Sequence, residues 1–284
     1  MSLPEAIERK CVEVLGSPIL DARFVGGGDI GVARLLRTEN GRFFLKYSRE
    51  LSGFFPFEAE ARGLELLRNA SPIRIPEVIF CDKTFLLLEY IEPGLADNSF
   101  WENFGLAFSE LHRNTSSFFG LEFDNYIGRL SQTNSKRNLW PDFFREMRLE
   151  PQSRQAFDLG YFTPHDIAGM GRLYRNLPEI FPPEKPALIH GDLWSGNYLV
   201  SHAGEPVLID PAVSYSHREM DLAMSRLFGG FDWRFYRSYE EAYPLAPGFE
   251  ERLPVYQLYY LLVHVNLFGA AYLGPVRDIM SRWG

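Results

Sequence analysis

Cysteine is scarce in this chain of 284 residues, and positive charge is not clustered anywhere along it. The two cysteines, Cys11 and Cys81, lie far apart and lack the spacing of metal ligands. This argues against a disulfide framework and indicates a reducing, cytoplasmic location. Lys and Arg together number 29 against 37 acidic residues and form no run, so binding to nucleic acid has little electrostatic support. The sequence also has no repeats and no low-complexity tract.

Long uncharged stretches are also rare. Residues 253–276 contain no charged side chain and are numerous enough to span a bilayer. Polar residues interrupt the stretch, among them Gln257, His264 and Asn266, and two glycines weaken one continuous helix. We therefore expect a core helix here and no membrane span.

The most informative segment that is present has the sequence HGDLWSGN, at residues 190–197. Asp192 precedes Asn197 by the spacing of the protein-kinase catalytic loop, H-R-D-x-x-x-x-N. Two short apolar runs follow, separated by turn-prone residues 201–205, and they predict a hairpin that ends at Asp210. Asp210 would then lie beside Asn197, where both side chains could hold Mg²⁺ through oxygen atoms. The alternative is an Asx-rich loop that satisfies only its own backbone.

A glycine-rich segment, GGGDIG at residues 26–31, lies between two predicted strands, 22–25 and 32–37. Asn40-Gly41 then predicts a two-residue turn into a third strand, 43–47. The glycines also match G-x-G-x-x-G, the dinucleotide-binding pattern, but that pattern needs a helix after it, and here a strand follows. A turn that covers ATP phosphates fits this context better. The residues expected to form it are Gly26, Gly27, Gly28, Asp29 and Ile30.

Lys46 lies on the third predicted strand, where a kinase lysine pairs with the α- and β-phosphates and with a helix Glu. An exposed lysine at a sheet edge is the alternative. Glu58 and Glu60 are both candidate partners on the next helix, whose buried face includes Phe57. At about 100° per residue, Glu60 lies roughly 60° from Phe57, whereas Glu58 lies about 100° away on the other side. We therefore predict that Glu60 contacts Lys46.

An apolar segment, residues 85–88, runs toward a Pro-Gly break at residues 93–94 and predicts a hairpin with residues 78–80. In a two-lobed kinase the hinge follows such a strand, and its backbone groups hold the adenine. The candidate adenine contacts are therefore Glu89, Tyr90 and Ile91. A core strand followed by an ordinary loop would show the same pattern.

Taken together, these residues resemble the fructosamine kinase (ketosamine-3-kinase) family, within the aminoglycoside phosphotransferase-like kinases. The family-specific elements are the LWSG insert in residues 190–197 and the run HREMDLA at residues 217–223. The H-x-D and I-D-P elements alone are shared with aminoglycoside and choline kinases. The resemblance covers essentially the whole chain and includes LIDPA (208–212), LFGGF (227–231) and YQLY (256–259).

The resemblance implies an α+β fold of two lobes, similar to protein kinases. Residues 1–91 would form an N-terminal nucleotide-binding lobe with a small antiparallel sheet and a helix. Residues 92–284 would form a larger, mainly α-helical lobe that holds the catalytic groups and the substrate. The length of the chain suits two lobes around a cleft. We expect a monomer without nucleic-acid or membrane partners.

The family phosphorylates the 3-hydroxyl of sugars attached to amines, which makes the adduct unstable and serves deglycation. Carried over by position, Asp192 would orient the sugar hydroxyl and accept its proton. Asn197 and Asp210 would hold Mg²⁺, and Lys46, oriented by Glu60, would hold the ATP phosphates. Pro-Ala follows Asp210 in place of Phe-Gly, and no phosphorylatable activation segment occurs. These departures from protein kinases favour a permanently assembled site.

Four further residues are candidates for contact with the sugar that accepts the phosphoryl group. Trp194 would stack on the sugar, with burial as a lobe anchor as the alternative. His217, Arg218 and Glu219 would form either a wall of the substrate pocket or an internal polar network. A lone Glu among Trp, His and Arg suits a neutral sugar with one amine better than a polycationic aminoglycoside. Ribulosamine and erythrulosamine adducts are expected ahead of fructosamine.

Three other polar residues are expected to be structural. Asp221 would bond loop amides from the start of a helix, His190 would bond backbone carbonyls, and His112 would lie in the core. Two other functions also stay open: a kinase of another hydroxylated amine, such as an aminoglycoside or choline, and a non-catalytic kinase-fold binding protein. A binding protein would normally have lost Lys46, Asp192 or Asp210, and all three are present.

Overall fold

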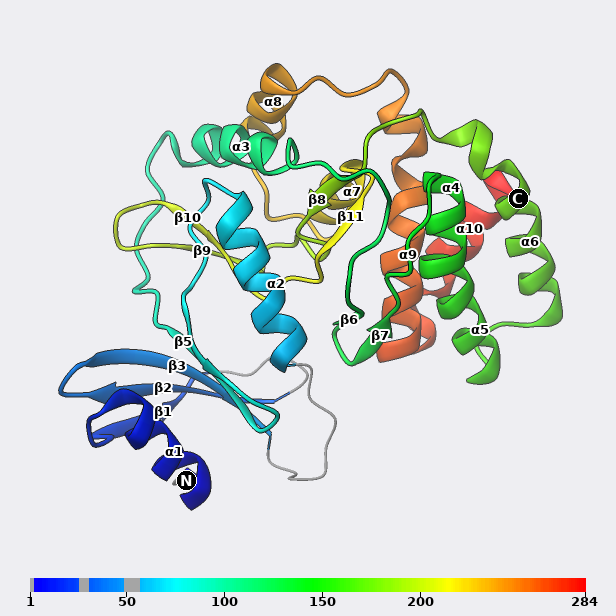
Figure 1. The fold of residues 1–284 in the computed structure, drawn as a ribbon. Coiled ribbons are helices and arrows are strands. Elements are labelled where there is room, and N and C mark those ends of the chain that lie inside the picture. Colours follow the sequence, from blue (N-terminus) through cyan, green and yellow to red (C-terminus); the bar gives the residue numbers. More distant parts are fainter. Residues whose placement is uncertain (1–2, 26–30, 49–56) are drawn as a thin grey trace.

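The computed structural model describes residues 3–25, 31–48 and 57–284, and within them the chain forms two lobes (Figure 1). The N-terminal lobe contains one antiparallel five-stranded sheet with the strand order β1-β2-β3-β5-β4. This is the α+β, kinase-like arrangement that the sequence predicts. The strands are β1 (Asp21–Phe24), β2 (Val32–Thr38), β3 (Gly41–Tyr47), β4 (Val78–Cys81) and β5 (Phe85–Glu89).

The turn between β2 and β3 lies one residue earlier than predicted. Thr38 pairs with Gly41, so Glu39 and Asn40 form the two-residue loop and Gly41 begins β3. The Asn40 side chain donates from Nδ2 to the Leu15 carbonyl, and its backbone N–H donates to Thr38 Oγ1. These side-chain contacts fix the position of the loop, and sequence spacing alone does not show them.

Two helices cover opposite faces of the sheet. Helix α1 (Glu5–Leu15) packs on one face with Leu45 and Leu87, and α2 (Phe57–Ala70) packs on the other with Leu86 and Leu88. Side chains alternate between the faces of a strand, so the continuous apolar run of β5 is buried on both sides. Lys46 pairs with Leu86 and therefore lies on the α2 face.

The C-terminal lobe is mainly helical and is organised around α9. That helix is buried along most of its length, including Tyr256, Tyr259 and Tyr260, and Gly269 caps its C-terminus. The predicted core helix is thus confirmed, and no described helix combines the length and apolarity that a bilayer span requires. The helices are α3 (Phe100–Leu111), α4 (Trp140–Phe143), η1 (Phe144–Leu149), α5 (Glu150–Asp158), α6 (Pro164–Ile180), α7 (Glu219–Leu227), α8 (Trp233–Ala242), α9 (Phe249–Phe268), η2 (Ala270–Tyr272) and α10 (Leu273–Trp283).

The C-terminal lobe also contains three short antiparallel strand pairs, which position the candidate site. The predicted hairpin before Asp210 is confirmed as β9 (Tyr198–Val200) and β10 (Pro206–Leu208). The segment 190–197 therefore joins β8 to β9, and Asp210 lies between β10 and β11. The other two pairs are β8 (Ala187–Ile189) with β11 (Ser214–Ser216), and β6 (Asn125–Ile127) with β7 (Leu130–Gln132). Both cysteines are free thiols.

Candidate active site

The Lys46 side chain contacts two carboxylates, Glu60 in its own lobe and Asp210 in the C-terminal lobe. Its Nζ donates to Glu60 Oε1 at 2.7 Å and also to Asp210 Oδ1. Glu58, in contrast, is exposed to solvent. The contact predicted from helical phase is confirmed, because the α2 face that packs on the sheet also carries Glu60 toward β3.

The charges in this cluster influence one another strongly. Burial raises the pKa of Glu60 to about 7, with Lys46 acting in the opposite direction and Asp210 adding to the rise. Burial also acts on Asp210, but the Lys46 ammonium outweighs it and holds the pKa of Asp210 below its usual value. The Lys46 pKa is raised, because the attraction of both carboxylates exceeds the effect of burial. At neutral pH the cluster therefore contains a charged Lys46 and a charged Asp210.

Asp192 and Asn197 contact each other directly. Asn197 Nδ2 donates to Asp192 Oδ2 and to the Asp192 carbonyl oxygen, both at 2.9 Å. Burial raises the pKa of Asp192 to about 7, while the Asn197 bond lowers it and the charges of Asp210 and Asp221 add to the rise. Because Nδ2 of Asn197 is committed to Asp192, its Oδ1 is the atom that can serve as a ligand.

The Asp221 and His190 side chains fix the start of the segment 190–197. Asp221 accepts from the N–H groups of His190 and Gly191 at 2.7 and 2.8 Å. His190 Nε2 lies 2.9 Å from the Ile209 carbonyl oxygen, which indicates an N–H donated to that oxygen. The predicted structural roles of both side chains are confirmed. His112 is also in the core, with Nε2 3.3 Å from Asp221 Oδ2.

Asp210 has an uncommon backbone conformation. Its φ of 53° is the one positive value at a non-glycine position in the described part of the chain. Such a conformation costs about 1–3 kcal/mol and persists where surrounding contacts impose it. It turns the carboxylate toward Lys46, and the Asp210 side chain remains 39% exposed.

The donor atoms at this point suit a hard divalent cation. Asn197 offers an amide oxygen and Asp210 a carboxylate, and oxygen ligands are those that Mg²⁺ prefers. The partial exposure of Asp210 leaves room for further oxygen ligands from water or phosphate. The residues present therefore fit Mg²⁺.

Residues 89–91, the predicted nucleotide contacts at the end of β5, have side chains that contact other protein groups or are buried. Glu89 pairs with Arg74, and the Tyr90 ring lies 5.4 Å from the Arg42 guanidinium. Ile91 is buried. Adenine contacts through the backbone of these residues stay a prediction. The predicted phosphate-covering residues, Gly26, Gly27, Gly28, Asp29 and Ile30, lie outside the described residues.

Residues 3–283 match the family model described as fructosamine kinase. The chain belongs to the fructosamine kinase family. It is 39% identical over 265 residues to a probable ketoamine kinase of Enterococcus faecium, covering 91% of this chain and 94% of that protein. It is 36% identical over 269 residues to the chloroplastic protein-ribulosamine 3-kinase of Arabidopsis thaliana, covering 91% and 81%.

Solved structures agree with this assignment. A fructosamine-3-kinase homologue from Thermobifida fusca has a TM-score of 0.91 at 34% identity, covering 98% of each chain. An ADP-bound aminoglycoside phosphotransferase has a TM-score of 0.65 at 14% identity, covering 98% of this chain and 97% of that chain, and so shares the fold. The predicted family and fold are confirmed, and the protein is a kinase.

In this fructosamine kinase family member, Trp194 is exposed on the loop after Asp192. Its side chain lies over Gly196, where an added Cβ would come 2.3 Å from the indole ring. With 38% of its surface exposed, Trp194 is not the buried lobe anchor that the sequence left as an alternative. Contact with a sugar stays a prediction.

The substrate-wall prediction for His217, Arg218 and Glu219 is wrong. All three are buried, with exposed fractions of 0%, 2% and 0%. Arg218 pairs with Glu184, and Glu219 accepts from Arg252 Nε at 2.6 Å. Buried charges need partners, and Glu184 and Arg252 are the partners of Arg218 and Glu219 in the interior. The alternative prediction, an internal polar network, is the one that the structure shows.

Sequence reasoning missed an aromatic cluster on α9 that reaches the segment 190–197 through Tyr260. Tyr260 Oη donates to the Gly191 carbonyl at 3.1 Å, and His264 lies one turn further along α9. The His264 ring is 4.7 Å from Phe228 and 5.3 Å from Phe268, and both phenylalanines are about half exposed. The i, i+4 spacing of Tyr260, His264 and Phe268 was the available signal.

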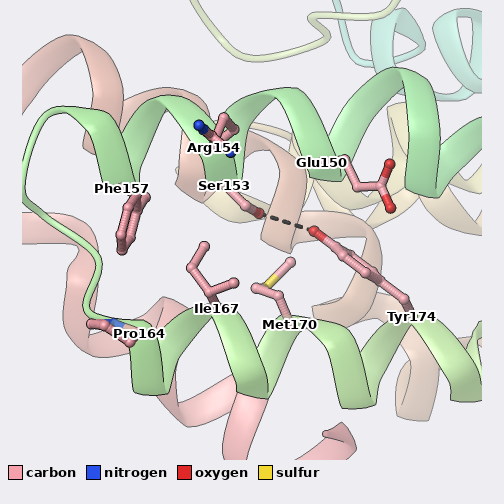
Figure 2. A pocket seen from close by; sticks show the side chains of 8 residues that line it. All are labelled: Glu150, Ser153, Arg154, Phe157, Pro164, Ile167, Met170 and Tyr174. Atoms are coloured by element: carbon pink, nitrogen blue, oxygen red, sulfur yellow. Dashed lines mark hydrogen bonds between the residues drawn. The ribbon is translucent and has the colours of Figure 1, made fainter.

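A groove lies between α5 and α6. These two helices lie on the side of the C-terminal lobe away from the sheet (Figure 1). Ser153 and Tyr174 contact each other through their hydroxyl groups, which lie 3.2 Å apart (Figure 2). The groove has a volume of about 420 Å³. Its surface is mainly apolar and has no paired carboxylates to hold a metal. The lining residues are Glu150, Ser153, Arg154, Phe157, Pro164, Ile167, Met170 and Tyr174.

Proposed function

We propose that this kinase transfers the γ-phosphoryl group of ATP to the 3-hydroxyl of a ketosamine, an amine that carries a 1-deoxy-2-keto sugar. The observation that carries the proposal is the assembled cluster in which Lys46 contacts both Glu60 and Asp210 beside the Asp192–Asn197 pair. Membership of the family supports the acceptor class. The names of the relatives, ketoamine kinase and ribulosamine 3-kinase, support it as well.

On the nucleotide side, Lys46 holds the α- and β-phosphates, and Glu60 keeps it in place. The phosphates then compete with Asp210 for the Lys46 ammonium, which frees the Asp210 carboxylate to act with Asn197 as a Mg²⁺ ligand. When bound, Mg²⁺ neutralises charge on the phosphates. The backbone of residues 89–91 holds the adenine at a hinge between lobes 1–91 and 92–284.

On the acceptor side, Asp192 orients the sugar hydroxyl and accepts its proton as the phosphoryl group is transferred. Asn197 fixes Oδ2 of Asp192, so Oδ1 is the oxygen directed to the hydroxyl. Trp194 offers an exposed indole face two residues away, suited to the C–H face of a sugar. A neutral sugar with a single amine fits these groups, and the first substrates to test are ribulosamine and erythrulosamine adducts of lysine, followed by fructosamine.

In the cell, 3-phosphorylation destabilises the adduct, so the proposed role is deglycation of amines or proteins. The two free cysteines support a reducing, cytoplasmic location. We further propose that the enzyme acts as a monomer.

The test is phosphate incorporation from labelled ATP into a panel of ketosamines. We expect incorporation into the ribulosamine or erythrulosamine adduct, and loss of incorporation when the keto group is reduced with borohydride. Asp192→Asn serves as the matched control, because it keeps the shape of the side chain and removes its ability to accept a proton. Efficient phosphorylation of kanamycin or choline, with none on any ketosamine, would overturn the proposal.

A further inference from the structure

Four polar side chains are buried beneath the segment that follows Asp210, and none of them belongs to the proposed catalytic set. Each is at most 3% exposed, although amides and guanidinium groups are normally found at the surface. They lie on or next to β6, β7 and η1. The residues are Asn125, Gln132, Asn134 and Arg148.

Two of these side chains bond consecutive carbonyl groups of the segment after Asp210. Gln132 Nε2 donates to the Ala212 carbonyl oxygen at 3.2 Å, and Asn125 Nδ2 donates to the Val213 carbonyl oxygen at 2.8 Å. Ala212 is also held from the other side, because its N–H donates to the His190 carbonyl at 2.9 Å. The backbone after Asp210 is thus held between the catalytic loop and the β6–β7 hairpin.

The remaining bonds fix which way each amide points. Asn125 Oδ1 accepts from Gln132 at 2.8 Å and from Asn134 at 2.9 Å, and Gln132 Oε1 accepts from Tyr259 at 2.6 Å. Arg148 donates to Asn134 Oδ1 at 2.7 Å. Since every amide oxygen is occupied by a donor, the N–H groups of Asn125 and Gln132 are directed at the Ala212 and Val213 carbonyls.

The same hairpin region supports the helix that carries Glu60. The Arg62 guanidinium on α2 lies 3.7 Å from the centre of the Phe123 ring, just before β6. A Cβ added at Gly63 would lie 3.4 Å from the side chains of both Pro211 and Val213. In Figure 1 the β6–β7 hairpin lies between α2 and α9, and the Gln132–Tyr259 bond joins it to α9.

We propose that the β6–β7 hairpin is a permanent clamp for the metal-binding segment, with Asn125 and Gln132 as positioning residues. The clamp imposes the unfavourable φ of Asp210 from its C-terminal side, while the bond from the Ile209 N–H to the Asn197 carbonyl imposes it from the other. It therefore fixes the Asp210 carboxylate relative to Lys46 and Asp192 in a chain that lacks a phosphorylatable activation segment. The inference rests on the proposed use of Mg-ATP.

The test compares two buried glutamines that are both replaced by methionine, which has a similar shape and no N–H group. In Gln132→Met we expect kcat to fall roughly 10- to 100-fold, as for a displacement of about 1 Å. Mg²⁺ increases nucleotide affinity in the wild-type protein, and in the variant this increase should be smaller by about fivefold or more. Calorimetry with a non-hydrolysable ATP analogue measures it. Nucleotide affinity without Mg²⁺ should stay unchanged.

Gln152→Met is the matched control. Gln152 is buried on α5, and its Oε1 accepts from Asn266 at 2.8 Å, with no contact to the Asp210 segment. We expect it to cost a comparable amount of thermal stability but to leave kcat and Mg-dependent affinity within about twofold of wild type. If Gln132→Met and Gln152→Met had the same kcat and the same Mg-dependent affinity, the clamp would be excluded.

A second variant covers the case in which Gln132→Met does not fold. Asn125→Asp keeps the shape and both accepted bonds but replaces the N–H donor to Val213 by an oxygen. Arg148 bonds Asn134, the neighbour of Asn125 in this network. Asn125→Asp should also weaken Mg-dependent nucleotide affinity, and wild-type affinity would exclude the clamp. Absence of any Mg-dependent binding in the wild-type protein would instead overturn the proposed function itself.

Discussion

Gly191 and Ala212 lie so close together that a Cβ atom on Gly191 would come within 2.0 Å of the Ala212 carbonyl oxygen. Gly191 also has a φ of +86°, a conformation that other residues rarely adopt. Gly191 precedes Asp192, and Ala212 lies two residues after Asp210. This contact therefore brings the backbone next to Asp192 close to the backbone that follows Asp210.

We expect Gly191→Ala to lower the free energy of unfolding by more than about 1 kcal/mol, because a methyl group there meets both a backbone oxygen and a positive φ. Urea denaturation measures the change. Gly171→Ala on α6 is the matched control, since an added Cβ there has no atom within 4 Å and no positive φ is involved. The control should be neutral or stabilising by roughly 0.5–1 kcal/mol. Equal stability of the two variants would contradict the close contact.

Removing the Asp192 carboxylate and removing the Asp210 carboxylate should have different effects. Asp192→Ala is expected to reduce kcat by at least ~10²-fold, as for loss of a general base, with ATP binding largely intact. Asp210→Ala should instead remove Mg-dependent nucleotide binding, because a ligand of the metal that bridges the phosphates is lost. Steady-state kinetics and calorimetry separate the two effects. Near-wild-type turnover of Asp192→Ala would reject its assigned role.

The contact of Lys46 with Glu60 can be tested by comparing substitutions of two glutamates on α2. Glu60→Gln should lower kcat/KM much more than Glu58→Gln, since Glu60 lies 2.7 Å from Lys46 Nζ and Glu58 faces solvent. Both substitutions replace a carboxyl group on α2 by an amide of the same shape, so the comparison controls for the chemical change. A larger loss in Glu58→Gln would show that Lys46 does not depend on Glu60 during turnover.

Arg252→Met should be strongly destabilising, because it leaves the fully buried Glu219 carboxylate without its countercharge. The expected loss is about 3–5 kcal/mol, and adding Glu219→Gln should restore part of it. Arg154→Met is the control, because the Arg154–Asp158 pair is exposed and such pairs contribute at most about 1 kcal/mol. A loss in Arg252→Met no larger than that of the control would argue against a buried ion pair.

Stability at acid pH should depend on Asp166, which forms the capping box of α6 with Thr163. The hydrogen bonds from Arg277 lower the pKa of Asp166 to about 2, with bonds from Thr163 adding to the effect against burial. A carboxyl whose pKa is lower when folded stabilises the fold above its unfolded pKa, and this contribution is lost as pH falls through the folded value. The stability difference between wild type and Asp166→Asn should therefore be full near neutral pH and shrink between about pH 4 and pH 2.

Denaturant titrations of both proteins across that range provide the measurement. The exposed substitution Asp278→Asn on α10 is the control and should change stability by no more than about 0.5 kcal/mol. A wild-type to Asp166→Asn difference that stays constant from neutral pH to pH 2 would be inconsistent with the Arg277 contact.

The sequence alone was sufficient to predict contacts between residues that are close along the chain, and to predict which face of a periodic element is buried. Asp192 and Asn197 are five positions apart, and a short hairpin returns Asp210 to them, so spacing and turn residues predict the cluster. Helical phase distinguished Glu60 from Glu58 because the buried face of a helix is set by its 3.6-residue period. The uncharged run within α9 similarly marked a core helix.

Only the tertiary structure decided where the long-range partners lie. The sequence could not choose between a substrate wall and an interior network for residues 217–219, because Glu184 and Arg252, which neutralise them, are more than thirty residues away. The sequence could not predict the Asn125–Gln132 clamp for the same reason. The carbonyl groups that accept hydrogen bonds from Asn125 and Gln132 belong to a segment about eighty residues further on. Local periodicity determines which face of an element is buried, whereas the partner of a buried polar group depends on how distant elements pack.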